Sequence, residues 1–204
     1  MSVEYNLPIV RERKLAIQTG DPERVAEQKK LGKMTARERI GLLFDKASFV
    51  ELDALVGRDG ESGVVTGYGL IDGRPACVYA QDYTVMGGAV GAEHARKVIK
   101  VMDLAAKTGA PVVALFDSMG VRLKEGVDAV NAYASISAKT AQLSGVVPQI
   151  AVVLGQCAAS AGNPFFRRHV RRKKILLSPQ TCERSECDAE GCNPSRKRWR
   201  FRDV

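Results

Sequence analysis

Two short segments rich in small residues have the composition of loops that bring backbone N–H groups close to a ligand. The first spans residues 117–126 (DSMGVRLKEG) and the second spans residues 155–162 (GQCAASAG). Small side chains allow a ligand atom to approach the backbone, and the first N–H groups of a helix have no partner inside it. Small residues also suit tight packing of a strand against a helix, and for the second segment alone this alternative stays open.

The candidate donors are backbone amides beside Gly120 in the first segment and at Ala159 and Ser160 in the second. Each segment follows an apolar stretch with the pattern of a buried strand, so we expect the two segments to lie side by side. Two converging N–H groups form an oxyanion hole, and losing one donor typically slows a reaction roughly 10²- to 10³-fold. Such a pair suits a thioester whose carbonyl becomes an enolate.

Other catalytic arrangements find less support in the residues. Ser160 is not in a G-x-S-x-G context, and His94 is the only histidine before residue 163, which disfavours a Ser/His/Asp triad. Cys157 meets the same objection, and we interpret it as a small packed residue. The chain has neither a P-loop motif nor a G-x-G-x-x-G motif. Three charged residues could act as acids or bases, but such residues more often brace a loop: Asp117, Arg122 and Glu125.

The elements around these segments alternate between strand and helix. Residues 111–116 and 149–154 are continuous apolar runs of the kind that form strands buried on both faces. Helical patterns cover residues 92–107 and 127–144, and the first of them ends at Gly109. This order predicts an α/β architecture in which ligands bind beyond the strand ends.

The N-terminal part, residues 8–46, has helical signals. Asp21 followed by proline and glutamate is a good helix start, and residues 35–38 (TARE) form a capping box. We interpret the lysines of this part as a solvated face, with contact to an anionic cofactor as the alternative: Lys29, Lys30 and Lys33.

A strand and a hairpin follow the helical part. Residues 49–56 read as a first strand, and residues 63–71 and 75–80 as a hairpin across the Asp72–Gly73 turn. The hairpin leads into residues 81–91 (QDYTVMGGAVG), which we expect to form a glycine-bearing loop.

The basic character of the chain lies in its last 42 residues. The whole chain of 204 residues has a formal net charge of +8. Residues 163–204 hold 12 basic and 5 acidic residues, a net charge of +7, and the rest holds 19 and 18, a net charge of +1. No apolar run approaches the roughly 18 residues of a membrane span, and no secretory signal is recognisable, which favours the cytoplasm.

Three interpretations compete for residues 163–204. Basic clusters with Trp199 and Phe201 could bind nucleic acid. Four residues could bind zinc, although no C-x-x-C pair is present: His169, Cys182, Cys187 and Cys192. We favour the third, a stretch in an altered reading frame that is largely disordered, and we therefore expect neither nucleic acid nor a bound metal.

Four segments together resemble biotin-dependent acyl-CoA carboxyltransferases, the subunits of propionyl-CoA, acetyl-CoA and methylcrotonyl-CoA carboxylases and of related decarboxylases. They are residues 34–51 (MTARERIGLLFDKASFVE), 81–97 (QDYTVMGGAVGAEHARK), 109–127 (GAPVVALFDSMGVRLKEGV) and 144–162 (SGVVPQIAVVLGQCAASAG). The resemblance covers about residues 10–162. It implies a crotonase-like ββα superhelix, here an incomplete N-terminal carboxyltransferase domain.

The resemblance also implies roles for individual residues. In the family, the N-terminal domain holds the acyl-CoA and backbone N–H groups stabilise its enolate. These donors fall at Ala159 and Ser160, where the family usually has two glycines, and beside them at Gly120 and Val121. The residues expected to contact the CoA ester are Gly87, Gly88, Ala89 and Arg122. Met119 and Val121 replace small residues usual in the family, which leaves the acyl preference open.

By this resemblance the chain has three parts: a helical segment (1–46), a partial carboxyltransferase domain (47–162) and the basic tail (163–204). The implied reaction moves a carboxyl group between carboxybiotin, carried on a partner protein, and the α-carbon of an acyl-CoA. Implied partners are biotin carboxyl carrier and biotin carboxylase subunits, with a homo-oligomeric parent. Because the resemblance ends at residue 162, we expect a truncated chain that is inactive alone. The alternative is a non-catalytic acyl-CoA-binding scaffold subunit.

Overall fold

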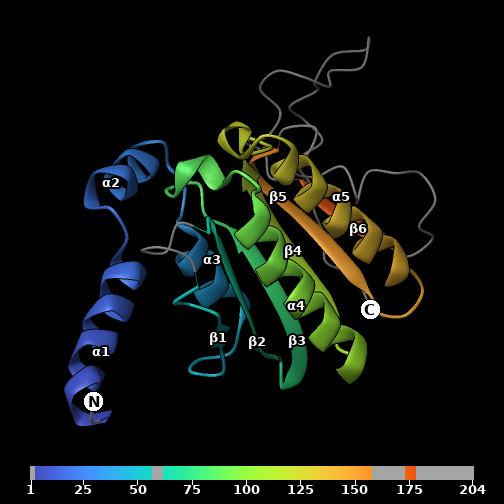
Figure 1. Ribbon diagram of the computed structural model, residues 1–204. Helices are drawn as coiled ribbons and strands as arrows, with labels where there is room; N and C mark the ends of the chain where they lie inside the picture. The colour runs from blue at the N-terminus through green and yellow to red at the C-terminus, as the bar shows by residue number, and fades with distance from the viewer. Residues whose placement is uncertain (1–2, 57–61, 158–172, 178–204) are drawn as a thin grey trace.

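The computed structural model describes residues 3–56, 62–157 and 173–177, and its α/β architecture is shown in Figure 1. Three helices precede the sheet: α1 (Val3–Thr19), α2 (Pro22–Lys30) and α3 (Ala36–Leu43). The strands are β1 (Val50–Leu52), β2 (Val64–Ile71), β3 (Arg74–Gln81), β4 (Val112–Ser118), β5 (Gln149–Cys157) and β6 (Lys173–Leu177). The helical elements between them are η1 (Met86–Gly88), α4 (Ala92–Thr108), η2 (Leu123–Glu125) and α5 (Val127–Gln142).

The described strands form one sheet in the order β1-β2-β3-β4-β5-β6. The first three are antiparallel neighbours, whereas β3, β4, β5 and β6 run parallel. Helices α4 and α5 provide the crossovers and lie side by side over one face (Figure 1). Parallel strands joined in this way end at one edge of the sheet, and the loops that follow them gather there.

Both faces of the sheet are buried at its central strands β3 and β4. Tyr79 and Phe116 point toward α4 and α5, and their rings meet edge to face with centroids 6.0 Å apart. The alternate residues, such as Val78 and Leu115, face the other side, where Ile40 of α3 packs on them. Burial on both faces explains the continuous apolar run of β4, because a half-exposed strand would alternate apolar and polar residues.

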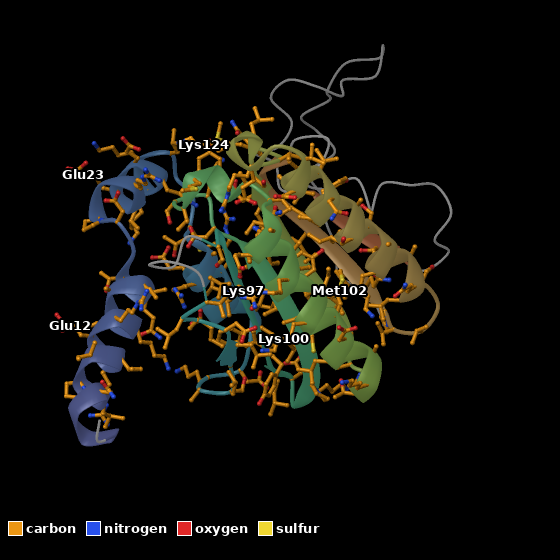
Figure 2. All side chains as sticks on the ribbon, in the orientation of Figure 1. Glu12, Glu23, Lys97, Lys100, Met102 and Lys124 are labelled. Atoms are coloured by element: carbon orange, nitrogen blue, oxygen red, sulfur yellow. The ribbon has the colours of Figure 1, made fainter. Side chains whose placement is uncertain are left out.

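Figure 2 shows how α4 is anchored through its side chains. Met102 is fully buried, and Lys97 is only 3 % exposed and donates from Nζ to the Val64 carbonyl oxygen at 2.8 Å. Lys100 lies on the outer side and pairs with Asp53 at 2.7 Å. The C-terminus of the helix at Gly109 has a φ of 73°, a conformation that glycine adopts without steric cost.

The structure confirms most of the predicted elements and corrects the ends of some. The hairpin over Asp72–Gly73 and the helix starts at Asp21 and Thr35 are as predicted. The strand predicted at 49–56 is shorter and covers only Val50–Leu52. The strand predicted at 149–154 is longer, since Gly155, Gln156 and Cys157 continue β5 rather than begin a turn.

The expectation that residues 163–204 are largely without regular structure does not hold for Lys173–Leu177, which pair with β5 as β6. The other residues of this tail lie outside the described part of the chain, as do Trp199, Phe201 and the three tail cysteines. The interpretations as a nucleic-acid grip, a zinc site or an altered reading frame therefore stay hypotheses.

Replacing Thr35 with alanine is expected to lower the free energy of unfolding by about 1 kcal/mol. The Thr35 hydroxyl accepts from the Glu38 N–H at 3.3 Å, and the Glu38 carboxylate accepts from the Thr35 N–H at 2.9 Å. Urea denaturation followed by circular dichroism measures the change. Thr19→Ala is the matched control, because that exposed hydroxyl donates only to Leu15 of its own helix. Equal effects of the two substitutions would contradict the capping role.

Candidate functional site

The carboxyl ends of β4 and β5 lie next to each other, as predicted, and residues 155–157 are the part of the second small-residue segment that the structure describes. Phe116 pairs with Val153 and Ser118 pairs with Cys157, so the register shifts between these positions. A step of two residues along β4 therefore corresponds to a step of four residues along β5. Ala159 and Ser160 lie outside the described residues, so their placement as oxyanion donors stays a prediction.

The loop that follows β3 pairs with the loop that follows β4, a contact that the sequence did not indicate. The Met119 N–H donates to the Gly87 carbonyl at 2.9 Å, and the Val90 N–H donates to the Gly120 carbonyl at 2.8 Å. The Arg122 N–H returns a hydrogen bond to the Val90 carbonyl at 2.9 Å. This short parallel bridge brings the predicted CoA-contacting residues of the first loop next to the predicted donors of the second.

The glycines of the first loop are needed for this close approach. Gly87 and Gly88 both have a φ of 64°, a left-handed conformation that disfavours residues with a side chain. A Cβ on Gly88 would overlap the Asp117 carbonyl oxygen, and one on Gly87 would overlap the Met119 side chain. Two backbones can therefore pack here at a distance that larger residues would prevent. Ala89, the third predicted residue, is buried.

The amides of the second loop differ in how they are used. The Gly120 N–H already donates to the Ser118 hydroxyl at 3.0 Å, and its Met119 and Arg122 neighbours donate to the first loop. Within the described residues, the Val121 N–H makes no hydrogen bond. Of the two donors predicted in this loop, Val121 is therefore the one whose amide has no hydrogen-bond partner among the described residues, whereas the Gly120 amide is already bound to Ser118.

Arg122 and Glu125 brace the loop, in keeping with the interpretation that charged residues there are structural. Arg122 donates to the Glu125 carboxylate at 3.0 Å and to the Ala89 carbonyl at 3.4 Å. The other Glu125 oxygen accepts from the Ala92 N–H at 2.8 Å, at the start of α4. An anion at a helix N-terminus is favourable. The Arg122 side chain is only 12 % exposed, so little of its surface is available for the predicted contact with the CoA ester.

Replacing Glu125 with glutamine is expected to cost about 1 kcal/mol of unfolding free energy, because the ion pair and the helix-end charge are both lost. Glu93→Gln is the matched control, since Glu93 also lies in the first turn of α4 but pairs with Arg96 at an exposed surface. The control is expected to change stability by less than about 0.5 kcal/mol. Thermal or urea unfolding distinguishes the two, and equal losses would contradict the bracing role.

A buried carboxylate behind these loops was not recognised from the sequence as an ion-pair centre. Asp117 is fully buried, and its Oδ2 accepts from Arg39 Nη2 of α3 at 2.7 Å. Lys33 Nζ lies 3.9 Å from Asp117 Oδ1 and 5.5 Å from the centre of the Tyr83 ring. The prediction that Lys33 belongs to a solvated face is therefore wrong, because its side chain is only 17 % exposed and points to the strand ends. Lys30 is exposed, as predicted.

Cys157, a possible nucleophile, and His94, a possible base, are both poorly suited to acyl-enzyme chemistry. Burial, with a further contribution from Asp117, raises the pKa of Cys157 to about 11, so the thiol stays protonated near neutral pH. Burial, with the nearby cations Arg122 and Lys97, lowers the pKa of His94 to about 3. His94 lies inside α4 and is 1 % exposed, whereas Ser160, the candidate triad serine, lies outside the described residues.

The described residues include no cluster of three or more His, Cys, Asp or Glu side chains that could hold a metal ion. Among these residues, no helix combines the length and the apolar character that a membrane crossing requires.

The comparisons with known proteins agree with this architecture. The model of the carboxyl transferase domain family matches residues 27–166, and the chain belongs to this family. It is 49 % identical over 153 residues to the alpha subunit of methylmalonyl-CoA decarboxylase from Propionigenium modestum, covering 70 % of this chain and 30 % of that protein. It is 47 % identical over 157 residues to the propionyl-CoA carboxylase beta chain of Saccharopolyspora erythraea, covering 72 % and 29 %.

A solved structure of transcarboxylase 12S, described as a hexamer with methylmalonyl-coenzyme A bound, superposes with a TM-score of 0.78. It is 35 % identical, and the match covers 87 % of this chain and 36 % of that one. The α/β fold of these neighbours agrees with the crotonase-like fold that the sequence predicts. The chain spans about a third or less of the length of the relatives it matches.

Proposed function

We propose that the chain is a carboxyltransferase component of a biotin-dependent acyl-CoA carboxylase or decarboxylase. It would move a carboxyl group between carboxybiotin and the α-carbon of an acyl-CoA such as propionyl-CoA or acetyl-CoA. Membership of the carboxyl transferase domain family supports this function. The methylmalonyl-coenzyme A bound to transcarboxylase 12S supports the substrate class.

In the proposed mechanism, backbone amides at the ends of β4 and β5 bind the thioester oxygen. The donors would be Val121 and, after rearrangement, Gly120 on one side, with Ala159 and Ser160 on the other. As the α-carbon loses a proton, negative charge moves to this oxygen, and fixed amides stabilise it without reorganising. The enolate carbon then bonds to the carboxyl carbon as the N–C bond of carboxybiotin breaks, and biotin ends with the proton. The protein supplies position and charge stabilisation, so no side-chain nucleophile is needed.

The single observation that carries the proposal is the pairing at the strand ends. The 81–91 loop is fixed on the loop after β4, and the Val121 amide is left without a partner among the described residues. We infer that Gly87, Gly88 and Ala89, with Arg122 behind them, form the wall along which the CoA ester lies. This placement joins the predicted CoA-contacting residues to the predicted donors in one site.

Isothermal titration of the 204-residue chain tests the proposal. Propionyl-CoA is expected to bind more tightly than CoA, because only the ester has the carbonyl oxygen that the amides recognise. Equal affinity for the two ligands, or no binding of either, would contradict the proposed site. Inorganic phosphate at the same concentration is a control for attraction between the basic chain and an anion.

Turnover is a separate question from binding. Biotin carboxyl carrier and biotin carboxylase subunits would supply carboxybiotin, and homo-oligomeric assembly is proposed in analogy to the transcarboxylase hexamer. Transfer of radiolabel from carboxybiotin to propionyl-CoA by the isolated chain would overturn the prediction that it is inactive alone. Binding without transfer is expected both for an incomplete carboxyltransferase and for the alternative, a non-catalytic scaffold subunit. The division into residues 1–46, 47–162 and 163–204 and the cytoplasmic location stay predictions.

A further inference from the structure

One fully buried carboxylate lies where the predicted site is assembled. Asp117 is the second-last residue of β4, and Met119, Gly120 and Val121 follow it directly. A carboxylate buried in this way is strongly unfavourable unless a cation neutralises it. Arg39, itself 6 % exposed, supplies that cation from α3 at 2.7 Å. Lys33, from the connection before α3, is the second cation at 3.9 Å.

Asp117 contacts each of the segments that meet at this edge of the sheet. Its carboxylate packs directly on Gly155 of β5, where a Cβ would overlap it, and the β4–β5 register shifts at this point. Its carbonyl oxygen packs on Gly88 of the 81–91 loop. Its N–H donates to Gln81 Oε1 at 3.2 Å, at the end of β3. The side chain therefore acts as a spacer between the ends of β4 and β5.

A second line of contacts runs from the same part of the chain to β5. The Lys33 ammonium lies over the Tyr83 ring, and the Tyr83 hydroxyl lies 3.3 Å from Gln156 Oε1. Gln156 is the second-last residue of β5 and precedes the segment that holds Ala159. The ends of β4 and β5 are thus both tied to residues of the N-terminal helical segment.

We propose that Asp117 is a positioning residue, and that Arg39 and Lys33 hold its carboxylate so that the ends of β4 and β5 keep one spacing. This inference rests on the proposed function, because the spacing matters for a ligand oxygen bound between the two strand ends. Asp117 does not touch the substrate in this arrangement. It acts through the backbone that leads to Val121 and through the end of β5.

The first test is hydrogen exchange of the full chain measured by mass spectrometry. Asp117→Asn and Arg39→Gln are expected to speed exchange in peptides covering 118–123 and 150–157 roughly tenfold more than in α4. Arg39→Lys is expected to restore much of the protection. Arg37→Gln is the matched control, because Arg37 lies on the same helix as Arg39. Its ion pair is made with Glu51 of β1, away from the ends of β4 and β5. No change, or a uniform increase over the whole chain, would overturn the proposal.

The second test compares affinities for propionyl-CoA and CoA. In Asp117→Asn and Arg39→Gln, the preference for the ester is expected to disappear while the affinity for CoA stays within about threefold of the original. A merely structural role would lower the affinities for both ligands together, and that result would overturn the proposal. An unchanged preference for propionyl-CoA over CoA would also overturn it. If the unmodified chain binds neither ligand, the proposed function fails, and the exchange experiment still decides whether Asp117 sets the spacing.

Discussion

Replacing Arg39 with methionine is expected to lower the free energy of unfolding by about 3–5 kcal/mol. The substitution keeps an unbranched side chain of similar length but removes the cation that pairs with Asp117 at 2.7 Å. Among the described residues, the cation left beside this fully buried carboxylate would then be Lys33, at 3.9 Å. Urea denaturation at pH 7, followed by circular dichroism, measures the loss.

Two comparisons separate this effect from a general weakening of α3. Arg37→Met removes the pair with Glu51, whose charges are partly exposed, and is expected to cost about 1 kcal/mol. The double variant Arg39→Met with Asp117→Asn is expected to recover at least half of the loss, since the buried charge is gone. A cost below about 1 kcal/mol for Arg39→Met, or no recovery in the double variant, would contradict the account.

Lowering the pH from 7 to 5 is expected to destabilise the fold by about 2 kcal/mol through His94 alone. The pKa of this histidine is about 3 in the folded chain against 6.5 in the unfolded chain, because burial and the cations Arg122 and Lys97 disfavour its charged form. Between these two pKa values, the unfolded chain therefore binds a proton that the folded chain does not bind. The contribution of His94 to stability is present above pH 6.5 and is lost as the pH falls toward 3.

The pH dependence is tested by comparing the chain with His94→Asn, whose amide can replace the ring nitrogen that lies 3.1 Å from the Ser62 carbonyl. The variant is expected to be less stable at pH 7 but to lose about 2 kcal/mol less between pH 7 and pH 5. The comparison between the two proteins cancels the contribution of groups that they share. Parallel curves for the two proteins would contradict the assignment.

Sequence reasoning succeeded where the signal is local. The Thr35–Glu38 capping box, the Asp72–Gly73 turn and the glycine that ends α4 each depend on residues within a few positions of one another. The continuous apolar run of β4 likewise indicates, from neighbouring residues alone, a strand that is buried on both faces. The adjacency of the β4 and β5 ends follows from the order of strands and helices.

The parts that were missed depend on contacts between distant positions. The Arg39–Asp117 pair joins residues 78 apart, and no spacing rule connects them. β5 continues through Gly155, and the Asp117 carboxylate that packs there leaves no room for a side chain, so this glycine serves packing and was mistaken for a turn residue. Lys33 was placed on a solvated face because its partner lies on another element. A charged residue directly after a buried apolar strand was the available signal for Asp117.

The most direct measurement of the central claim is the carbon-13 resonance of [1-13C]propionyl-CoA mixed with the 204-residue chain. If backbone amides at the ends of β4 and β5 bind the thioester oxygen, the carbonyl resonance moves downfield on binding. The shift is expected to shrink with Val121→Pro, which removes one N–H donor. A bound ester whose carbonyl resonance stays at its value in water would contradict the account.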